Sequence, residues 1–308
     1  MSNAIGPVVE RPLWNTAIKN VMHHSIGFAS KLDRMLHQRS ELLLASDLAY
    51  VKQGHARQVC DIWAPHGSNR LLPSVFFVHG GSFRSLSKET FWMYGQRYAE
   101  RGFVVCLINY RLAPEHPCPV AILDVQRAYN WWVDNAEKYG ADPERIVVSG
   151  ESAGANLALG LTLALYNNQA NYLVSSQHFP KLCVPSCGIY DPSNPERFTG
   201  VRGKKWLPDL VLKGLENDYQ PNRHPLGSPL NWLEEQKTPV QLPHVEVIAG
   251  TRDSIVSDSH RLIQVLVEKN LSCNLTLYDA GHCFPSGHTQ SAKLFWSSIG
   301  ERMMHAFG

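Results

Sequence analysis

Three absences narrow what this chain of 308 residues can be. It has no apolar run close to the roughly 18 residues that a membrane-spanning helix needs, since the longest candidate, residues 157–166, has the length of a core helix. Its formal net charge is only +2, which argues against a dedicated nucleic-acid binder. It also shows no internal repeat or low-complexity tract. We therefore expect neither a membrane span nor a nucleic-acid partner.

Signs of secretion are also missing. The seven cysteines are odd in number and include no CxxC pair, which is typical of reduced thiols in a cytosol-like compartment. The first residues contain no basic region followed by an apolar run, so we expect no secretory signal and a cytoplasmic location. Hydrophobic residues make up 44% of the chain and charged residues 18%, a balance that predicts a folded domain with a sizeable core.

The sequence does contain a regular alternation of short apolar runs and helical patterns. The expected strands are residues 47–52, 57–64, 74–78, 103–109, 145–149, 182–187, 245–249 and 273–278. The expected helices are residues 88–101, 120–139, 153–166, 257–268 and 290–306. Most of the short runs are apolar throughout, which predicts strands buried on both faces. We expect an α/β fold with a sheet of about eight mostly parallel strands flanked by helices.

Two segments fall outside this alternation. Residues 1–46 have apolar side chains at helical spacing, and we expect an N-terminal helical cap segment there. Residues 190–243 are rich in proline, asparagine and charge and are too long for a plain connection. We expect them to form a cap insertion over one end of the sheet, within a single domain that spans residues 47–308.

The sharpest local motif is Gly150-Glu151-Ser152-Ala153-Gly154, which joins an expected strand to an expected helix. Small residues two positions before and two positions after Ser152 relieve the crowding of a sharp strand-to-helix turn. Such a turn exposes the serine hydroxyl and aims the N–H of Ala153 at the same point, at the positive end of a helix dipole. The alternative interpretation is a glycine-rich turn with an idle serine.

A second motif, residues 79–83, reads His-Gly-Gly-Ser-Phe and directly follows the expected strand 74–78. Paired glycines allow the backbone to approach a ligand closely. The N–H groups of Gly80, Gly81 and Ser82 are therefore candidates, together with that of Ala153, for stabilising an oxyanion. Taken alone, the motif is equally typical of a glycine turn.

A nucleophilic serine needs a base and an acid that orients the base. In hydrolases with such a turn, the acid and then the histidine follow the serine along the chain. His282 lies just past the last expected strand, and Asp253 follows the strand before it. Two other acids compete: we interpret Asp258 as a cap of the next helix, and Asp279 lies only three residues before the histidine. The expected catalytic set is therefore Ser152, Asp253 and His282.

Two phenylalanines flank these motifs. Phe83 ends the glycine motif, and Phe284 lies two residues after the expected base. We expect both rings to bind substrate by lining an acyl pocket, with simple packing in the core as the alternative.

Together these segments resemble the hormone-sensitive-lipase-like group of α/β-hydrolase esterases. The likeness runs from about residue 47 to the end of the chain and rests on the strings HGGSF, NYRLAPEHPCP, DPERIVVSGESAGANLA, GTRDSIV and AGH. The resemblance implies an eight-stranded hydrolase sheet, a Ser-Asp-His triad, an HGG oxyanion loop and a cap built partly from N-terminal helices.

Three features depart from the pattern of that group. Ser82 stands where the group usually has a third glycine, and Glu151 stands where it usually has aspartate. The loop that begins at Asp253 is more similar to that of bacterial feruloyl esterases or kynurenine-formamidase-like hydrolases.

We predict a carboxylesterase-type serine hydrolase that cleaves esters of small or medium acyl chain through an acyl-enzyme. Its expected partner is a small-molecule ester, no metal or organic cofactor is required, and the oligomeric state stays open, a homodimer included. One alternative is an aryl formamidase or amidase that uses the same triad. The other is a pseudo-hydrolase that binds a small molecule without cleaving it, an interpretation against which the presence of His282 argues.

Overall fold

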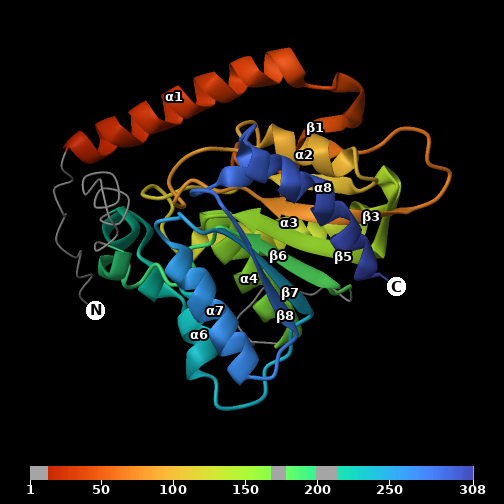
Figure 1. The fold of residues 1–308 in the computed structure, drawn as a ribbon. Helices are drawn as coiled ribbons and strands as arrows, with labels where there is room; N and C mark the ends of the chain where they lie inside the picture. The colour runs from red at the N-terminus through yellow and green to blue at the C-terminus, as the bar shows by residue number, and fades with distance from the viewer. Residues whose placement is uncertain (1–12, 168–177, 199–213, 308) are drawn as a thin grey trace.

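The computed structural model describes residues 13–167, 178–198 and 214–307. Its centre is a sheet of eight strands in the order β1-β2-β4-β3-β5-β6-β7-β8 (Figure 1). The strands are β1 (Leu43–Ala49), β2 (Val59–Trp63), β3 (Leu72–Val78), β4 (Val104–Ile108), β5 (Ala141–Glu151), β6 (Leu182–Ser186), β7 (His244–Gly250) and β8 (Cys273–Tyr278). Strand β2 runs antiparallel to β1 and β4, and every other neighbouring pair is parallel.

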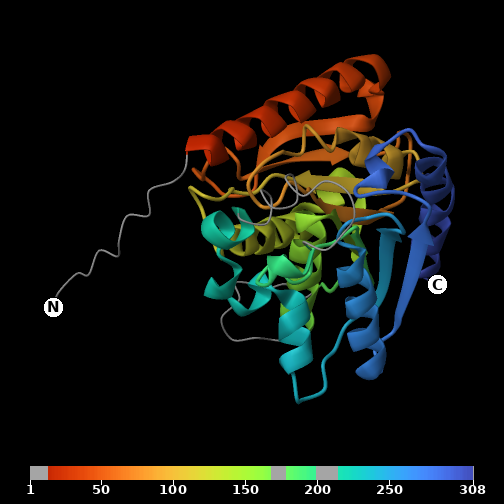
Figure 2. The same ribbon diagram turned by 60° about the vertical axis from the view of Figure 1, so that its left-hand side comes forward.

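Helices cover both faces of the sheet (Figures 1 and 2). The helices are α2 (Trp92–Ala99), α3 (Val120–Asn135), α4 (Ala153–Tyr166), α7 (Val256–Glu268) and α8 (Gln290–His305). In β3, Phe76 and Val78 join the apolar core that includes residues of α3, α4 and α7. Their neighbours Val75 and Phe77 join the other core, with residues of α2 and α8. This alternation buries β3 on both faces, which confirms the predicted mostly parallel sheet flanked by helices.

The N-terminal segment differs from its prediction at its end. Helix α1 (Leu13–His37) is a single long helix, and the 3-10 turn η1 (Ser40–Leu42) leads from it directly into β1. The sequence pattern extends the helical segment to residue 46 and starts the first strand at residue 47, whereas the strand begins at Leu43. Backbone pairing of Leu43 with Trp63 of β2 decides this, because a tertiary contact overrides a short helical pattern. Residues 1–12 of the expected cap segment lie outside the described residues.

Helix α1 crosses above β1 and α2 (Figure 1) and is attached to the body by polar contacts. The Ser30 hydroxyl donates to the carbonyl of Thr90 (3.1 Å), Asp33 pairs with His288 (3.3 Å), and the Arg34 guanidinium lies 6.0 Å from the centre of the Trp63 ring. Among residues 25–37, whose side chains the structure describes, five large apolar side chains are exposed instead, namely Ile26, Phe28, Leu32, Met35 and Leu36. A cap role for α1 stays a prediction. No described helix is both long and apolar enough to cross a membrane.

The long interval between β6 and β7 contains several short helical turns. Its described elements are η3 (Pro195–Phe198), the π-helical turn η4 (Leu215–Tyr219), η5 (Pro221–Arg223), η6 (Pro225–Gly227) and α6 (Pro229–Glu235). Part of the expected insertion, residues 199–213, lies outside the described residues. The turn η4 packs against the loop that follows β3, since the rings of Tyr219 and Phe83 stack with centres 3.7 Å apart and Asp218 pairs with Arg84 (2.5 Å).

Candidate active site

The turn between β5 and α4 presents Ser152 in a sparsely populated backbone conformation. Its φ of 57° and ψ of −118° are unfavourable for a residue with a Cβ, so the surrounding packing must hold the turn. The Ser152 N–H donates to the carbonyl of Ser186 at the end of β6 (2.9 Å). Helix α4 starts at the next residue, which puts the amide of Ala153 at a helix N-terminus beside the serine.

Glycine is required on both sides of this turn because two backbones nearly touch. A Cβ on Gly154 would lie 2.1 Å from the carbonyl oxygen of Val78 and 2.5 Å from that of His79. A Cβ on Gly150 would lie 2.3 Å from the carbonyl oxygen of Gly154. Real Cβ atoms do not approach this closely, so the start of α4 packs on the end of β3 only with glycine at both positions.

The loop after β3 passes directly beside Ser152. A Cβ on Gly80 would lie 3.2 Å from the Cβ of Ser152, and Gly81 has a φ of +115°. The next two residues, Ser82 and Phe83, also have positive φ values of 55° and 62°. In the part of the chain that the structure describes, the amides of Gly80 and Gly81 donate to no other backbone group. These two amides are therefore free to donate hydrogen bonds to a ligand oxygen.

His79, the first residue of this loop, is fully buried and supports the loop rather than facing Ser152. Its ring stacks on Tyr110 with centres 4.3 Å apart, its Nδ1 lies 2.6 Å from the Gly80 carbonyl oxygen, and its Nε2 lies 3.3 Å from a guanidinium nitrogen of Arg57.

His282 lies between Ser152 and Asp253 and contacts both. Its Nε2 is 3.0 Å from the Ser152 hydroxyl, and its Nδ1 is 2.8 Å from Oδ2 of Asp253. The acid is buried, and its Oδ1 also accepts from the N–H of Ile255 (2.9 Å). The imidazole is 36% exposed, so one side of it is open to solvent. Three residues that are far apart in the sequence therefore form one continuous hydrogen-bonded chain.

The surroundings of His282 favour its protonated form. Burial lowers the pKa of the imidazole, but the hydrogen bond and the charge of Asp253 outweigh this effect, with a further contribution from the charge of Glu151. The pKa of His282 is therefore raised above its ordinary value of about 6.5.

The two competing acids lie elsewhere. Oδ2 of Asp258 accepts from the N–H groups of Tyr190 (2.7 Å) and Asp191 (3.1 Å), just after β6. Asp258 therefore binds a neighbouring strand end, and our interpretation of this residue as a cap of its own helix is wrong. The side chain of Asp279 is 80% exposed and pairs with Arg252 (2.7 Å).

The two phenylalanines expected at an acyl pocket are both buried. Phe83 is fully buried against Tyr219, and Phe284 is 7% exposed and packs against Tyr278, with ring centres 4.9 Å apart. In this structure both rings contribute to packing, and a role for them in an acyl pocket stays a prediction.

One interaction at the site had little signal in the sequence. The buried carboxylate of Glu151 accepts hydrogen bonds from Tyr94 of α2 and from Ser286, which lies in the loop after His282. The position of Glu151 beside Ser152 marks it in the sequence, but nothing there indicates Tyr94 as its partner.

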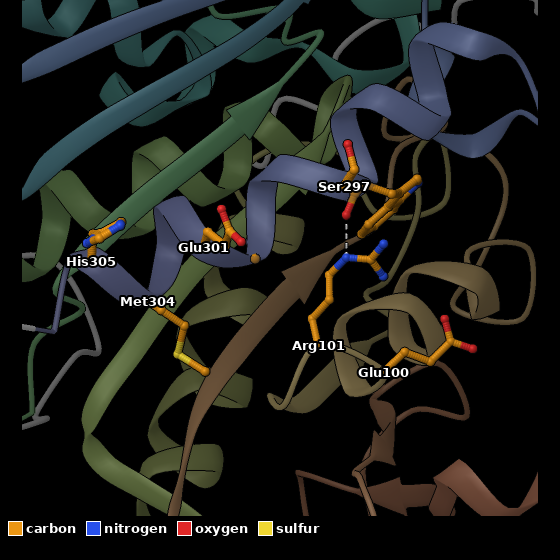
Figure 3. Close-up of a pocket in the computed structure, with 8 residues that line it drawn as sticks. Glu100, Arg101, Ser297, Glu301, Met304 and His305 are labelled. Carbon is orange, nitrogen blue, oxygen red and sulfur yellow. Dashed lines mark hydrogen bonds between the residues drawn. The ribbon is translucent and has the colours of Figure 1, made fainter.

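Two hollows of the surface flank α8, away from Ser152 and His282. One of them is lined by Glu100, Arg101, Trp296, Ser297, Gly300, Glu301, Met304 and His305 (Figure 3). There Nε of Arg101 donates to the carbonyl of Trp296 (2.5 Å), which fixes the guanidinium against α8 (Figure 3). These hollows are separate from the candidate active site.

Comparison with known proteins agrees with this geometry. A family model described as alpha/beta hydrolase fold matches residues 75–286, more than two thirds of the chain. The chain is 42% identical over 103 residues to arylacetamide deacetylase of Oryctolagus cuniculus, covering 32% of this chain and 26% of that protein. It is 30% identical over 247 residues to esterase LipC of Mycobacterium tuberculosis, covering 74% and 57%. The match thus spans less than two thirds of the length of either relative.

Among solved structures, the crystal structure of esterase B from Lactobacillus Rhamnosis matches with a TM-score of 0.77 at 18% identity. The match covers 95% of this chain and 97% of that one. At this level of identity the likeness supports the fold.

The contact between α4 and β3 can be tested at Gly154. An added methyl group would collide with two backbone carbonyls, which cannot rotate away as a side chain could. We expect Gly154→Ala to lower the free energy of unfolding by about 3 kcal/mol or more, measured by urea unfolding followed by circular dichroism.

Gly160, on the same helix, is a matched control, because the atom nearest to an added Cβ is 3.6 Å away. Gly160→Ala should be neutral or should stabilise the protein by up to about 1 kcal/mol, since alanine favours a helix. If the two variants were equally stable, the close packing at the turn would be disproved.

Proposed function

This chain belongs to the alpha/beta hydrolase fold family, in the hormone-sensitive-lipase-like group that its sequence resembles, and we propose that it is a serine hydrolase of carboxylic esters. The observation that carries the proposal is the chain of two hydrogen bonds from Ser152 through His282 to Asp253. The names of its relatives agree with the proposal, because several of them are called esterases. The amides beside the serine support the same chemistry.

In the first half of the reaction the hydroxyl of Ser152 attacks the ester carbonyl. Nε2 of His282 lies 3.0 Å from that hydroxyl and takes its proton as the new bond forms. Asp253 holds the other ring nitrogen, which keeps the imidazole in the required tautomer and stabilises the positive charge. His282 then gives the proton to the leaving alcohol, and the acyl group stays on Ser152.

The oxygen of the tetrahedral intermediate carries the developing negative charge. We propose that it accepts hydrogen bonds from the amides of Gly80, Gly81 and Ala153, with Ser82 completing the loop. These donors belong to the backbone and are held by the packing of β3 against α4, so they need not reorganise during the reaction. A water molecule activated by His282 then attacks the acyl-enzyme and frees the acid.

The first test is the loss of the nucleophile. We expect Ser152→Ala to lower kcat/KM for p-nitrophenyl butyrate by about a thousandfold or more while leaving the unfolding curve unchanged. The matched control is Ser149→Ala in the same strand, whose hydroxyl donates to the carbonyl of Val184 (2.9 Å) rather than to Ser152 or His282, and this variant should keep most of its turnover. Turnover by Ser152→Ala within about tenfold of the native protein would refute the assignment. So would failure of a fluorophosphonate probe to label Ser152, the result expected of a binding protein without catalysis.

The pH dependence follows from the base. His282 must be neutral to take the proton of Ser152, and its pKa is raised above the ordinary imidazole value. We therefore expect kcat/KM to fall as the pH drops through a pKa above about 6.5, because the protonated imidazole cannot act as the base. A profile of kcat/KM against pH, measured in overlapping buffers at constant ionic strength, gives this value. A fall of kcat/KM centred below about pH 6 would contradict the prediction.

The size of the acyl group is the finer part of the proposal. We expect small and medium chains to be preferred, so that kcat/KM is highest among p-nitrophenyl acetate, butyrate and hexanoate and falls for decanoate and palmitate. An aryl formamide and an aryl acetamide belong in the same panel, because one relative is named for an arylacetamide. If either amide were cleaved faster than every ester, the ester preference would be wrong.

A further inference from the structure

Glu151 occupies an unusual position for a charged residue. It is the last residue of β5, its side chain is 1% exposed, and it directly precedes Ser152. Its carboxylate accepts hydrogen bonds from the hydroxyl of Tyr94 and from that of Ser286, which lies 3.2 Å from both carboxylate oxygens. Among the described residues it forms no ion pair with lysine or arginine.

A buried carboxylate without a permanent cation is costly, since neutral hydrogen bonds replace only part of its hydration. The titratable groups whose charge or hydrogen bonds act on Glu151 come from three elements. They are Tyr94 and Tyr98 of α2, Cys187 after β6, and His282 and Cys283 of the loop after β8. Of these only His282 can become positive, so the carboxylate gains its best compensation when His282 carries the proton.

We propose that Glu151 is a positioning residue for the proposed hydrolysis, which ties the loop carrying His282 to the strand end carrying Ser152 and stabilises the imidazolium that forms in the transition state. This inference rests on the proposed function. The hydrogen bond that Ser286 donates to Glu151 joins two segments that are 135 residues apart, and Ser286 lies four residues after the proposed base. A base loop anchored in this way keeps the imidazole at a fixed distance from the serine hydroxyl.

The charges of Glu151 and His282 act on each other. Burial raises the pKa of Glu151 above its ordinary value, although hydrogen bonds from Tyr94 and Cys283, the charge of His282 and the hydrogen bond from Ser286 oppose this effect. In turn, the charge of Glu151 adds to that of Asp253 in raising the pKa of His282. His282 must be neutral to take the Ser152 proton, and it is positive in the transition state. The charge of Glu151 therefore stabilises the transition state more than the state that precedes it.

The decisive variant is Glu151→Gln, which keeps the size of the side chain and removes its charge. We expect kcat for p-nitrophenyl butyrate to fall by about tenfold with KM within about threefold. We also expect the acid limb of the kcat/KM profile to move to lower pH by roughly half a unit or more. A purely structural role would lower the profile in parallel without moving its acid limb, and that result would overturn the electrostatic part of the proposal.

Ser286→Ala tests the hydrogen bond between Ser286 and Glu151 separately from the charge of Glu151. It removes one hydrogen bond of a surface residue, so we expect a severalfold fall in kcat with no movement of the acid limb. This variant also tests the proposal if Glu151→Gln does not fold. An unchanged kcat in Ser286→Ala would show that the hydrogen bond between Ser286 and Glu151 does not position His282.

The pKa of His282 can be read without turnover, by NMR titration of histidine-labelled protein with His282→Gln to assign the signal. We expect a lower value in Glu151→Gln than in the native protein, and equal values would overturn the inference. If the native protein cleaved no ester but this difference were present, the proposed function would fail while the interaction between Glu151 and His282 would stand.

Discussion

The candidate active site depends on the contact between two backbones at the point where β5 turns into α4. The start of α4 lies so close to the end of β3 that a single methyl group on Gly154 would collide with two carbonyls. This contact holds Ser152 in a backbone conformation that a free chain would avoid. It also brings the loop after β3 within reach of the serine, so Ser152 and the amides that we propose as oxyanion donors are positioned by the same packing. The geometry of the candidate site therefore depends on the two glycines, Gly150 and Gly154, whose lack of a side chain allows the backbones to approach.

A second constraint acts on the loop after β3, where Ser82, Phe83 and Leu86 all have positive φ values. Side chains with a Cβ are unfavourable there, so contacts from outside the loop must compensate. The interval between β6 and β7 supplies them through the stacking of Tyr219 on Phe83 and the ion pair of Asp218 with Arg84. A segment that the sequence marks only as an insertion is thus part of what shapes the site.

Most of the sheet was predictable because its strands are buried on both faces and leave continuous apolar runs in the sequence. The nearness of Ser152, Asp253 and His282 was predictable too, because the ends of parallel strands meet at one edge, although their roles stay proposals. The failures share one cause. The start of β1 is set by pairing with Trp63, and the role of Asp258 is set by the amides of Tyr190 and Asp191. Such partners are distant in sequence, and no local pattern of residues encodes them.

The attachment of α1 has a consequence for how the molecule loses structure. Over residues 25–37, whose side chains the structure describes, the contacts given above involve polar or charged side chains, and the apolar side chains Ile26, Phe28, Leu32, Met35 and Leu36 are exposed. Neither apolar core includes a residue of this part of the helix. Detaching residues 25–37 would break a few contacts and uncover little of either core. We therefore expect residues 25–37 to open locally at a lower free energy than the central strands. Amide hydrogen exchange in α1 would report this local opening, whereas exchange in the central strands would report unfolding of the whole domain.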